Sequence, residues 1–211
     1  YAHLASVNVG IVSGARVGAG AVLGVMGRSA SYNIPRARAH LHFEIGFRLS
    51  DDFENWYERQ KFKNKNRHGK WNGMNLVSID PLDFYKSTWR GEADNLHEFL
   101  FTMPVAARIR VYSQDIPDFV KNYDALLTKP LDMRSIVAWD IAFTEYGVPK
   151  EWTPRFMEEN LLGKAGEVKV LTYNPKLLKS QNCQRVLTFS GGRPSITLDT
   201  LNTIRKIFGF R

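Results

Sequence analysis

The sequence predicts an α+β protein: a mostly antiparallel β part at the N-terminal end, followed by a separate mixed α/β unit. Residues 1–27 alternate short valine and isoleucine runs with glycine, which is typical of short strands joined by tight turns. Residues 49–75 are polar, aromatic and basic, which indicates an inserted loop. From about residue 95, strand-like alternation and helix-like periodicity both occur. We therefore expect one domain over 1–90, with its insertion at about 49–75, and an accessory α/β domain of unknown role over 95–211.

The elements of the first part follow from the same patterns. The glycine–valine segment has no helical periodicity, so short strands are expected there. Ala39–Phe47 alternates in character and predicts a further strand. A helical turn is expected at Phe53–Arg59 inside the insertion, and Ile79–Leu82 resumes an apolar segment that ends in a turn.

The second part mixes strands and helices. The expected strands are Val105–Tyr112, Ile136–Phe143, Glu167–Tyr173 and Arg185–Phe189. One helix is expected over Asp115–Leu127, and a final amphipathic helix carries Leu198, Leu201, Ile204 and Phe208. The Gly191–Gly192 pair predicts a hairpin turn, because it lacks the strand, glycine loop and lysine of a phosphate-binding loop.

Composition excludes several classes of protein. Hydrophobic residues make up 44% of the 211 and charged residues 24%, which is ordinary for a globular protein and argues against disorder. No apolar run reaches the roughly 18–20 residues that span a bilayer, so no transmembrane segment is expected in this chain. Cys183 is the single cysteine, which excludes an intrachain disulfide and a multi-cysteine metal site.

The positive charge is concentrated in the first part. Residues 1–90 hold 13 basic and 7 acidic side chains, and much of the excess lies in one stretch: Arg59, Lys61, Lys63, Lys65, Arg67 and Lys70. Such a run attracts a polyanion such as nucleic acid, anionic lipid or a cell-wall polymer, or it is a solvated loop. Aromatic residues are interleaved with it, but no nucleic-acid-binding motif accompanies them, so we do not expect nucleic acid as a partner.

The segment Ala39-His40-Leu41-His42-Phe43-Glu44-Ile45 carries the chemistry. On a strand, alternate side chains share a face, which would place both histidines and Glu44 together and the three apolar residues on the other face, able to pack on a core. Paired imidazoles can bind a metal and move a proton. The alternative is that they hydrogen-bond to each other or to the carboxylate, and the spacing alone does not separate these interpretations.

The wider order of residues resembles a known family. Tyr1-Ala2-His3-Leu4 precedes the glycine–valine ladder, the His40-Leu41-His42 strand follows it, and Ile79-Asp80-Pro81-Leu82 closes the segment. This order is similar to that of the lysostaphin/LytM-type zinc metallopeptidases, which cut peptide cross-links of bacterial peptidoglycan. The resemblance covers roughly residues 1–48 and 76–88. It implies a mostly antiparallel β peptidase domain of the lysostaphin type.

The resemblance assigns a role to each histidine. His42 matches the zinc ligand, His40 a catalytic histidine that orients or deprotonates the attacking water, and His3 the catalytic histidine that stabilises the oxyanion. Zinc is thus the implied cofactor. Glu44 either orients an imidazole or is a surface carboxylate.

The sequence departs from the family in two places. Arg38-Ala39 stand where the family has a small residue and proline. The family's other zinc ligands, a histidine and an aspartate four residues apart, have no counterpart here. His68 and His97 lack ligand-like spacing and are expected to be surface residues. The resemblance therefore implies an N-terminally truncated peptidase domain, which by itself should bind zinc poorly and hydrolyse nothing.

Two other functions were weighed against the peptidase, and one of them remains an alternative. A biotinyl or lipoyl carrier domain is excluded, because residues 1–49 contain no lysine. We expect a zinc-dependent endopeptidase of cell-wall peptidoglycan in the complete parent protein, in the periplasm or outside the cell. The alternative is a non-catalytic, peptidase-like module that binds wall or activates a hydrolase. The expected partner is the peptidoglycan peptide, and residues 95–211 are a candidate contact with another envelope protein.

Overall fold

The computed structural model describes residues 1–30, 32–132, 134–180 and 186–210. These residues form two compact units, Tyr1–Ile45 and Gly46–Arg211. Helices and antiparallel strand pairs occur together, so the α+β class is confirmed. Cys183 and the start of the strand expected at Arg185–Phe189 lie outside the described residues.

Unit 1, Tyr1–Ile45, is built around one two-stranded ribbon. Its elements are β1 (Leu4–Val7), β2 (Gly24–Met26) and a 3₁₀ turn, η1 (Arg36–Arg38). β1 and β2 pair antiparallel, with Leu4 opposite Met26 and Val7 opposite Gly24. The long connection between them makes tight turns, as the glycines predict.

Most apolar side chains of unit 1 are exposed. Val9, Val12, Val22 and Val25 are all more than half exposed, whereas Ile34 is buried. Backbone hydrogen bonds and glycine contacts therefore define this unit more than side-chain packing does.

The prediction of a strand over Ala39–Phe47 is largely wrong. The regular strand β3 covers only Ile45–Arg48, and residues 39–44 lie outside it, with one isolated bridge between His42 and Ala2. A ladder needs a partner strand of matching length, and here the partner is a single residue. Leu41 is 45% exposed, so the expected packing of this apolar face on a core is not found there, while Phe43 lies against Tyr1 with ring centroids 5.0 Å apart.

Unit 2, Gly46–Arg211, begins within β3, whose first residue is Ile45 of unit 1, and continues with the segment around the insertion. β3 pairs with β4 (Leu76–Ile79) in a two-stranded sheet. Between them lie α1 (Phe53–Arg59), η2 (Gly69–Trp71) and η3 (Gly73–Asn75), and after β4 come α2 (Pro81–Trp89) and α3 (Leu96–Thr102). The helical turn expected at Phe53–Arg59 is confirmed. Asp80 caps α2 by accepting a hydrogen bond from the Leu82 backbone.

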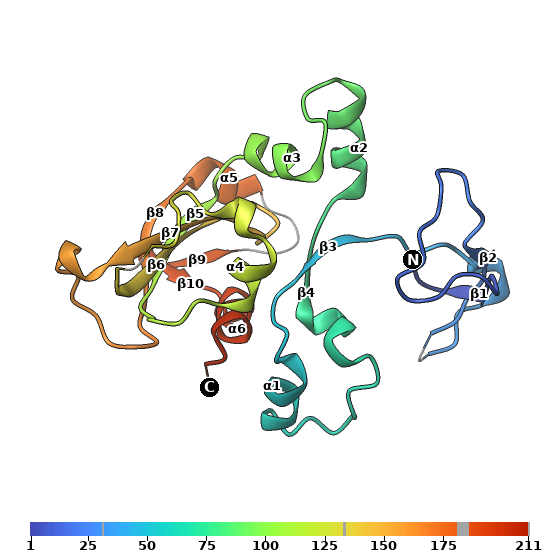
Figure 1. Cartoon of the computed structure of the whole chain (residues 1–211), viewed down its shortest axis with the longest axis horizontal. Coiled ribbons are helices and arrows are strands. Elements are labelled where there is room, and N and C mark those ends of the chain that lie inside the picture. The colour runs from blue at the N-terminus through green and yellow to red at the C-terminus, as the bar shows by residue number, and fades with distance from the viewer. Residues whose placement is uncertain (31, 133, 181–185, 211) are drawn as a thin grey trace. The chain divides into compact units, whose positions relative to one another are not determined.

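A four-stranded antiparallel sheet with the order β7-β6-β5-β8 forms the centre of unit 2 (Figure 1). Its strands are β5 (Ala107–Val111), β6 (Ile136–Phe143), β7 (Pro149–Phe156) and β8 (Val168–Tyr173). The remaining elements are α4 (Asp118–Asn122), η4 (Asp124–Leu126), η5 (Met157–Glu159), α5 (Pro175–Ser180), β9 (Leu187–Ser190), β10 (Arg193–Ile196) and α6 (Leu198–Phe208).

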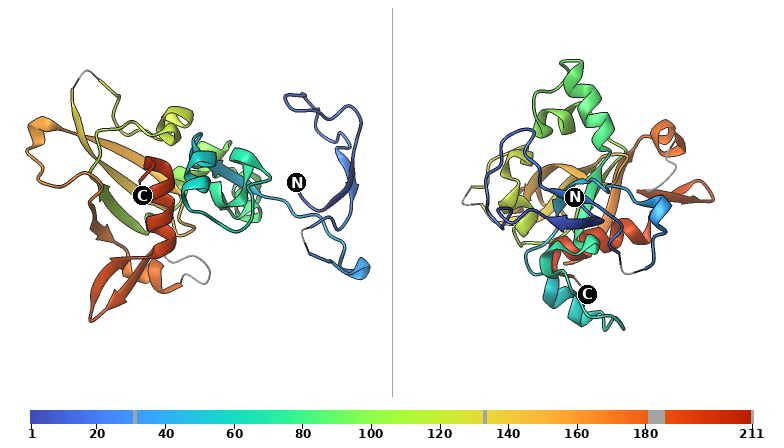
Figure 2. Two further views of the ribbon diagram at one scale, coloured as in Figure 1. Left: turned by 90° about the horizontal axis from the view of Figure 1, so that it is seen from below. Right: turned by 90° about the vertical axis from the view of Figure 1, so that its right-hand side faces the viewer.

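The core of unit 2 lies on one face of this sheet, where α6 and α4 cover it (Figures 1 and 2). Trp152 is fully buried and its ring contacts Phe119, Trp139 and Phe208 at centroid distances of 5.5–6.0 Å. Burial of each such aromatic side chain stabilises the fold by roughly 2–3 kcal/mol.

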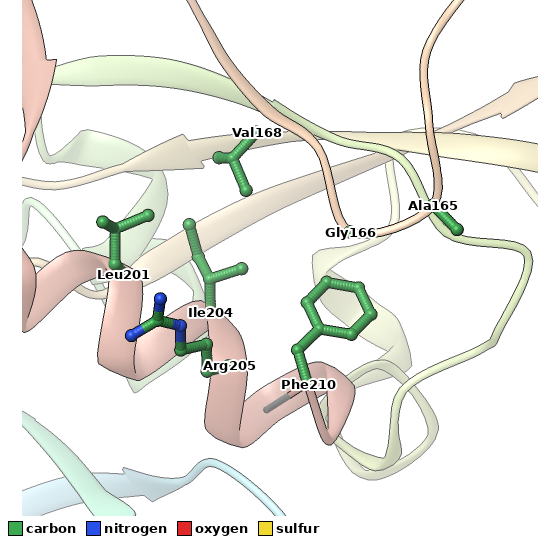
Figure 3. Close-up of a pocket in the computed structure, with 7 residues that line it drawn as sticks. All are labelled: Ala165, Gly166, Val168, Leu201, Ile204, Arg205 and Phe210. Carbon is green, nitrogen blue, oxygen red and sulfur yellow. The ribbon is translucent and has the colours of Figure 1, made fainter.

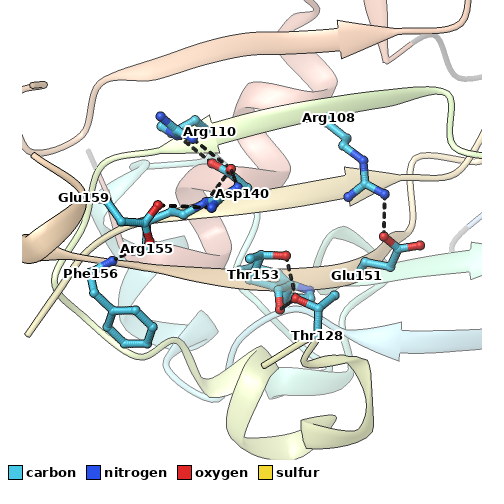
Figure 4. Close-up of polar contacts among 10 residues, drawn as sticks. Arg108, Arg110, Thr128, Asp140, Glu151, Thr153, Arg155, Phe156 and Glu159 are labelled. Atoms are coloured by element: carbon cyan, nitrogen blue, oxygen red, sulfur yellow. Dashed lines mark hydrogen bonds and ion pairs between the residues drawn. The ribbon is translucent and has the colours of Figure 1, made fainter. Parts of the chain in front are cut away.

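The opposite face of the sheet is charged, and its charges are paired (Figure 4). Asp140, 3% exposed, accepts two hydrogen bonds from Arg110 and one from Arg155. Arg108 donates to Glu151 at 2.6 Å. Successive side chains of a strand point to opposite faces of the sheet. The same strands therefore place the paired charges on one face and the aromatic core on the other.

The strands predicted at Val105–Tyr112, Ile136–Phe143 and Glu167–Tyr173 are confirmed within a few residues at each end, as are the final helix and the hairpin at Gly191–Gly192. The helix expected over Asp115–Leu127 is shorter, consisting of α4 followed by the 3₁₀ turn η4. Strand β7 was not predicted, because it contains Pro149 and Pro154. Proline cannot donate to a ladder, but β7 lies at the sheet edge, where that loss is tolerated.

The two compact units divide after Ile45. Residues 46–90 contact later parts of unit 2: Phe47 packs on Phe119 and Tyr123, and Tyr146 donates to Asp83 at 2.6 Å. The assignment of residues 1–90 to a peptidase domain and 95–211 to an accessory domain stays a prediction.

Candidate metal centre

Three histidines come together in unit 1. Each of His3, His40 and His42 offers one ring nitrogen, and these nitrogens lie within 4.8 Å of one another. The ring of His3 lies 4.8 Å from that of His40 and 5.6 Å from that of His42, edge to face in both cases. The structure thus gathers all three candidate site residues into one group, from segments nearly forty positions apart.

Two glycines allow this approach. A Cβ atom at Gly24 would lie 2.3 Å from the Ser6 carbonyl oxygen, and one at Gly27 would lie 2.4 Å from the Ala5 nitrogen. Only residues without a side chain permit such close backbone contact. The Gly27 carbonyl in turn accepts a hydrogen bond from the His40 backbone at 3.2 Å. The absence of a side chain at Gly24 and Gly27 therefore allows the start of β1 to approach the segment that carries His40.

A second backbone contact positions His42. The amide of Ala2 donates to the His42 carbonyl at 2.7 Å, and the His42 amide donates back to Ala2 at 3.4 Å. Because Ala2 and His3 are neighbours in sequence, this bridge places His42 beside His3 without a regular strand.

His3 has a left-handed backbone conformation, with φ of 62°. This region is unfavourable for residues with a Cβ atom by about 1–2 kcal/mol. Two hydrogen bonds fix the turn: His3 Nδ1 donates to the Ser29 carbonyl at 2.6 Å, and Ser29 Oγ donates to the Leu4 carbonyl at 2.8 Å. The ring is thereby held facing the other two histidines.

The partners of each ring determine which nitrogen is free. His40 Nδ1 contacts the Arg38 carbonyl at 2.8 Å, as His3 Nδ1 contacts that of Ser29. A carbonyl oxygen only accepts, so in both rings Nδ1 carries the proton and Nε2 has a free lone pair. His42 Nε2 donates to Glu44 Oε1 at 2.6 Å, which leaves His42 Nδ1 free. Glu44 contacts the imidazole and is also about half exposed, so the structure does not separate the two roles left open for it.

The donor chemistry of this group fits zinc. Three neutral imidazoles are a known ligand set of catalytic zinc, and ligating histidines usually donate their second N–H to a carbonyl or carboxylate. All three do so here. Ligand nitrogens of one tetrahedral zinc lie roughly 3.3 Å apart, and the three ring nitrogens here lie within 4.8 Å of one another.

The other two histidines do not join this group. His97 donates through Nε2 to the Ala125 carbonyl at 2.8 Å and packs on Phe101 in unit 2. His68 is exposed and precedes the turn η2. Among the residues that the structure describes, His3, His40 and His42 are the single set of three or more metal-ligating side chains placed to share an ion.

Unit 2 has hollows of a different character. One, of about 390 Å³, lies between α6 and the start of β8 and is lined by Val168, Leu201, Ile204 and Phe210 together with Arg205 (Figure 3). Arg205 is the one ionisable side chain among the described residues that line it. This cavity therefore offers no metal ligands and no acid–base pair.

The sequence did not identify the residues that support the centre. Ser29 and Arg38 act through their carbonyl oxygens, which any residue provides, so side-chain identity gives no signal. Gly27 was noted as part of a turn-rich ladder, but its close contact with Ala5 is a property of the folded chain.

No family model matches the sequence, no curated protein matches it, and no solved structure matches the fold. None of the described helices is both long enough and apolar enough to cross a lipid bilayer.

Proposed function

We propose that these residues belong to a zinc-dependent endopeptidase of bacterial cell-wall peptidoglycan, which acts in the periplasm or outside the cell as part of the complete protein. The convergence of His3, His40 and His42 supports this proposal most, since the residues that the resemblance selects are the three that lie within 4.8 Å. The resemblance to lysostaphin/LytM-type enzymes supplies the substrate, the peptide of peptidoglycan. Residues 95–211 are proposed as a contact with another envelope protein.

Each histidine has a distinct part in this proposal. His42 would hold the metal through Nδ1, with Glu44 orienting its ring from the other nitrogen. When bound, zinc polarises the scissile carbonyl and lowers the pKa of its water to near 7.

The remaining two rings handle the proton and the developing charge. His40 Nε2 is free and basic, because Nδ1–H is held by Arg38, and it would accept the proton of the attacking water. His3, held by Ser29, would place its Nε2 at the oxyanion and donate to it when protonated. Their rings lie 4.8 Å apart, so both can reach one scissile bond.

The test measures release of free amino groups from purified peptidoglycan by the natural full-length protein, with and without zinc. We expect zinc-dependent cleavage that falls by at least about 100-fold in His42→Ala and His40→Ala. His68→Ala is the matched control, because this exposed histidine lies outside the group, and it should retain full activity.

Unchanged cleavage by His42→Ala would overturn the proposal. A full-length protein that retains wall binding and cleaves nothing, with or without zinc, would favour the alternative of a non-catalytic peptidase-like module.

A further inference from the structure

The basic stretch of the insertion is exposed along its whole length. We name Arg59–Lys70 the cationic segment; its six basic side chains are Arg59, Lys61, Lys63, Lys65, Arg67 and Lys70, and it contains no acidic residue. All six of these residues are exposed. The structure therefore presents six cations within twelve residues to solvent.

These cations are almost free of ion pairs. Arg59 approaches Asp52 at 3.9 Å, and within the described residues no other member of the segment has a carboxylate within ion-pair distance. The nearest acidic side chains along the chain, Glu54 and Glu58, belong to α1 and share a hollow with Lys61 and Lys65 without pairing. In contrast, the arginines of the sheet face in unit 2 are neutralised by Asp140 and Glu151.

The segment has a defined shape. Buried Phe53 and Trp56 anchor α1, from which the segment leaves. The Tyr57 hydroxyl donates to the Asn64 carbonyl at 2.8 Å, and the Asn66 side chain donates to the Gly69 carbonyl at 3.0 Å. Because these bonds hold the backbone, less conformational entropy is lost when the segment binds a ligand.

The two exposed aromatic rings beside the segment already have partners. Phe62, 43% exposed, lies 4.8 Å from Tyr57, and Trp71, 61% exposed, has the Arg48 guanidinium 5.0 Å and the Lys70 ammonium 6.0 Å from its centroid. Single-stranded nucleic acids are bound by stacking bases on open rings, and membranes take up apolar side chains. Phe62 is the one apolar side chain between Arg59 and Lys70. Six cations against one such side chain favour a ligand recognised by its phosphate charge.

We propose that the cationic segment binds a linear phosphate-bearing polymer of the cell wall and so holds the protein at its substrate. The choice of a wall polymer rests on the proposed function, whereas the charge and exposure of the segment do not. Electrostatic binding of this kind requires no specific groove and raises the local concentration of the bound partner.

The test compares two variants with equal loss of charge. The first replaces Lys61, Lys63, Lys65 and Lys70 by glutamine; the control replaces Lys129, Lys164, Lys176 and Lys179, which are also exposed. Binding to synthetic poly(glycerol phosphate) is measured by fluorescence anisotropy between 50 and 300 mM NaCl. Circular dichroism verifies that both variants are folded.

We expect the first variant to bind at least about tenfold more weakly, with a salt slope shallower by about 3, from roughly 0.7 for each lost phosphate contact. The control should stay within about twofold of the wild type, since its lysines lie outside the segment. His42→Ala should bind the polymer like the wild type, so failure of the zinc chemistry would not be mistaken for failure of this proposal.

Three results would overturn it. The first is absence of polymer binding by the wild-type protein. The second is equal weakening in both lysine variants, which would mean that only net charge matters. The third is tighter binding of oligo(dT) or of phosphatidylglycerol vesicles than of the polymer at equal phosphate concentration.

Discussion

Replacing Gly27 by alanine should open the histidine centre without touching a histidine. The new Cβ would lie 2.4 Å from the Ala5 nitrogen and 2.7 Å from the Ala5 Cα, where ordinary contact begins at 3.4 Å. Both neighbours are backbone atoms, so rotation of a side chain cannot relieve the overlap. The start of β1 must therefore move by about 1 Å, and His3 stands two residues before Ala5.

This shift is large on the scale of catalytic geometry. A misplacement of about 1 Å can cost about 100-fold in rate, and in the proposed function the His3 ring must reach the oxyanion. Few side chains of unit 1 are buried, so little packing resists the movement. We expect cleavage of peptidoglycan by the natural full-length protein to fall by about 10–100-fold.

Release of amino groups from peptidoglycan checks this on the wild-type full-length protein, on Gly27→Ala and on Gly10→Ala. Gly10 is the matched control, because a Cβ there meets nothing within 4 Å. Cleavage by Gly27→Ala within about twofold of the wild type would refute the reasoning, as would an equal loss in Gly10→Ala.

Three further predictions concern charges. Glu44→Gln weakens the partner of His42, the proposed zinc ligand, and should lower the zinc affinity of the natural full-length protein by about tenfold in isothermal titration. Asp140→Ala leaves two guanidinium groups without their buried partner, so urea unfolding should show a loss of about 3 kcal/mol, with a much smaller loss for the exposed Asp132→Ala. Burial lowers the pKa of Lys206 to about 8, below its ordinary value of 10.5. Since the unfolded chain then binds more protons between pH 8 and 10.5, the free energy of unfolding of the wild type, relative to Lys206→Met, should rise across that range. A flat difference would contradict the lowered pKa.

Local patterns predicted three strands of the central sheet, the helix at Phe53–Arg59 and the final helix of unit 2, but not α2, α3 or α5. Ile136–Phe143 alternates and lies within the sheet, and Leu198–Phe208 is amphipathic and packs by its apolar face. These predictions hold because burial on one face imposes a period that is visible in the sequence. β7 was not predicted, because a strand with two prolines is tolerated only at the edge of a sheet. Which strand lies at the edge depends on how the strands pair in the folded chain.

Prediction was weaker in unit 1, where few side chains are buried. Without a buried face, alternation does not guarantee a ladder, and Ala39–Phe47 yielded a regular strand only from Ile45. The division of the chain after Ile45 depends on contacts of Phe47 with residues more than seventy positions away in the sequence. Amino-acid composition carries no information on such contacts.

The sequence by itself determined the α+β class, the six cations of the insertion and the choice of His3, His40 and His42 as candidate site residues. Residue type and spacing carry that information directly. Only the tertiary structure decided that the three rings meet, which nitrogen of each is free, and that Glu44 contacts His42. Those facts depend on backbone carbonyls and on the close approach at Gly27, and neither is encoded in the identity of the residues that provide them.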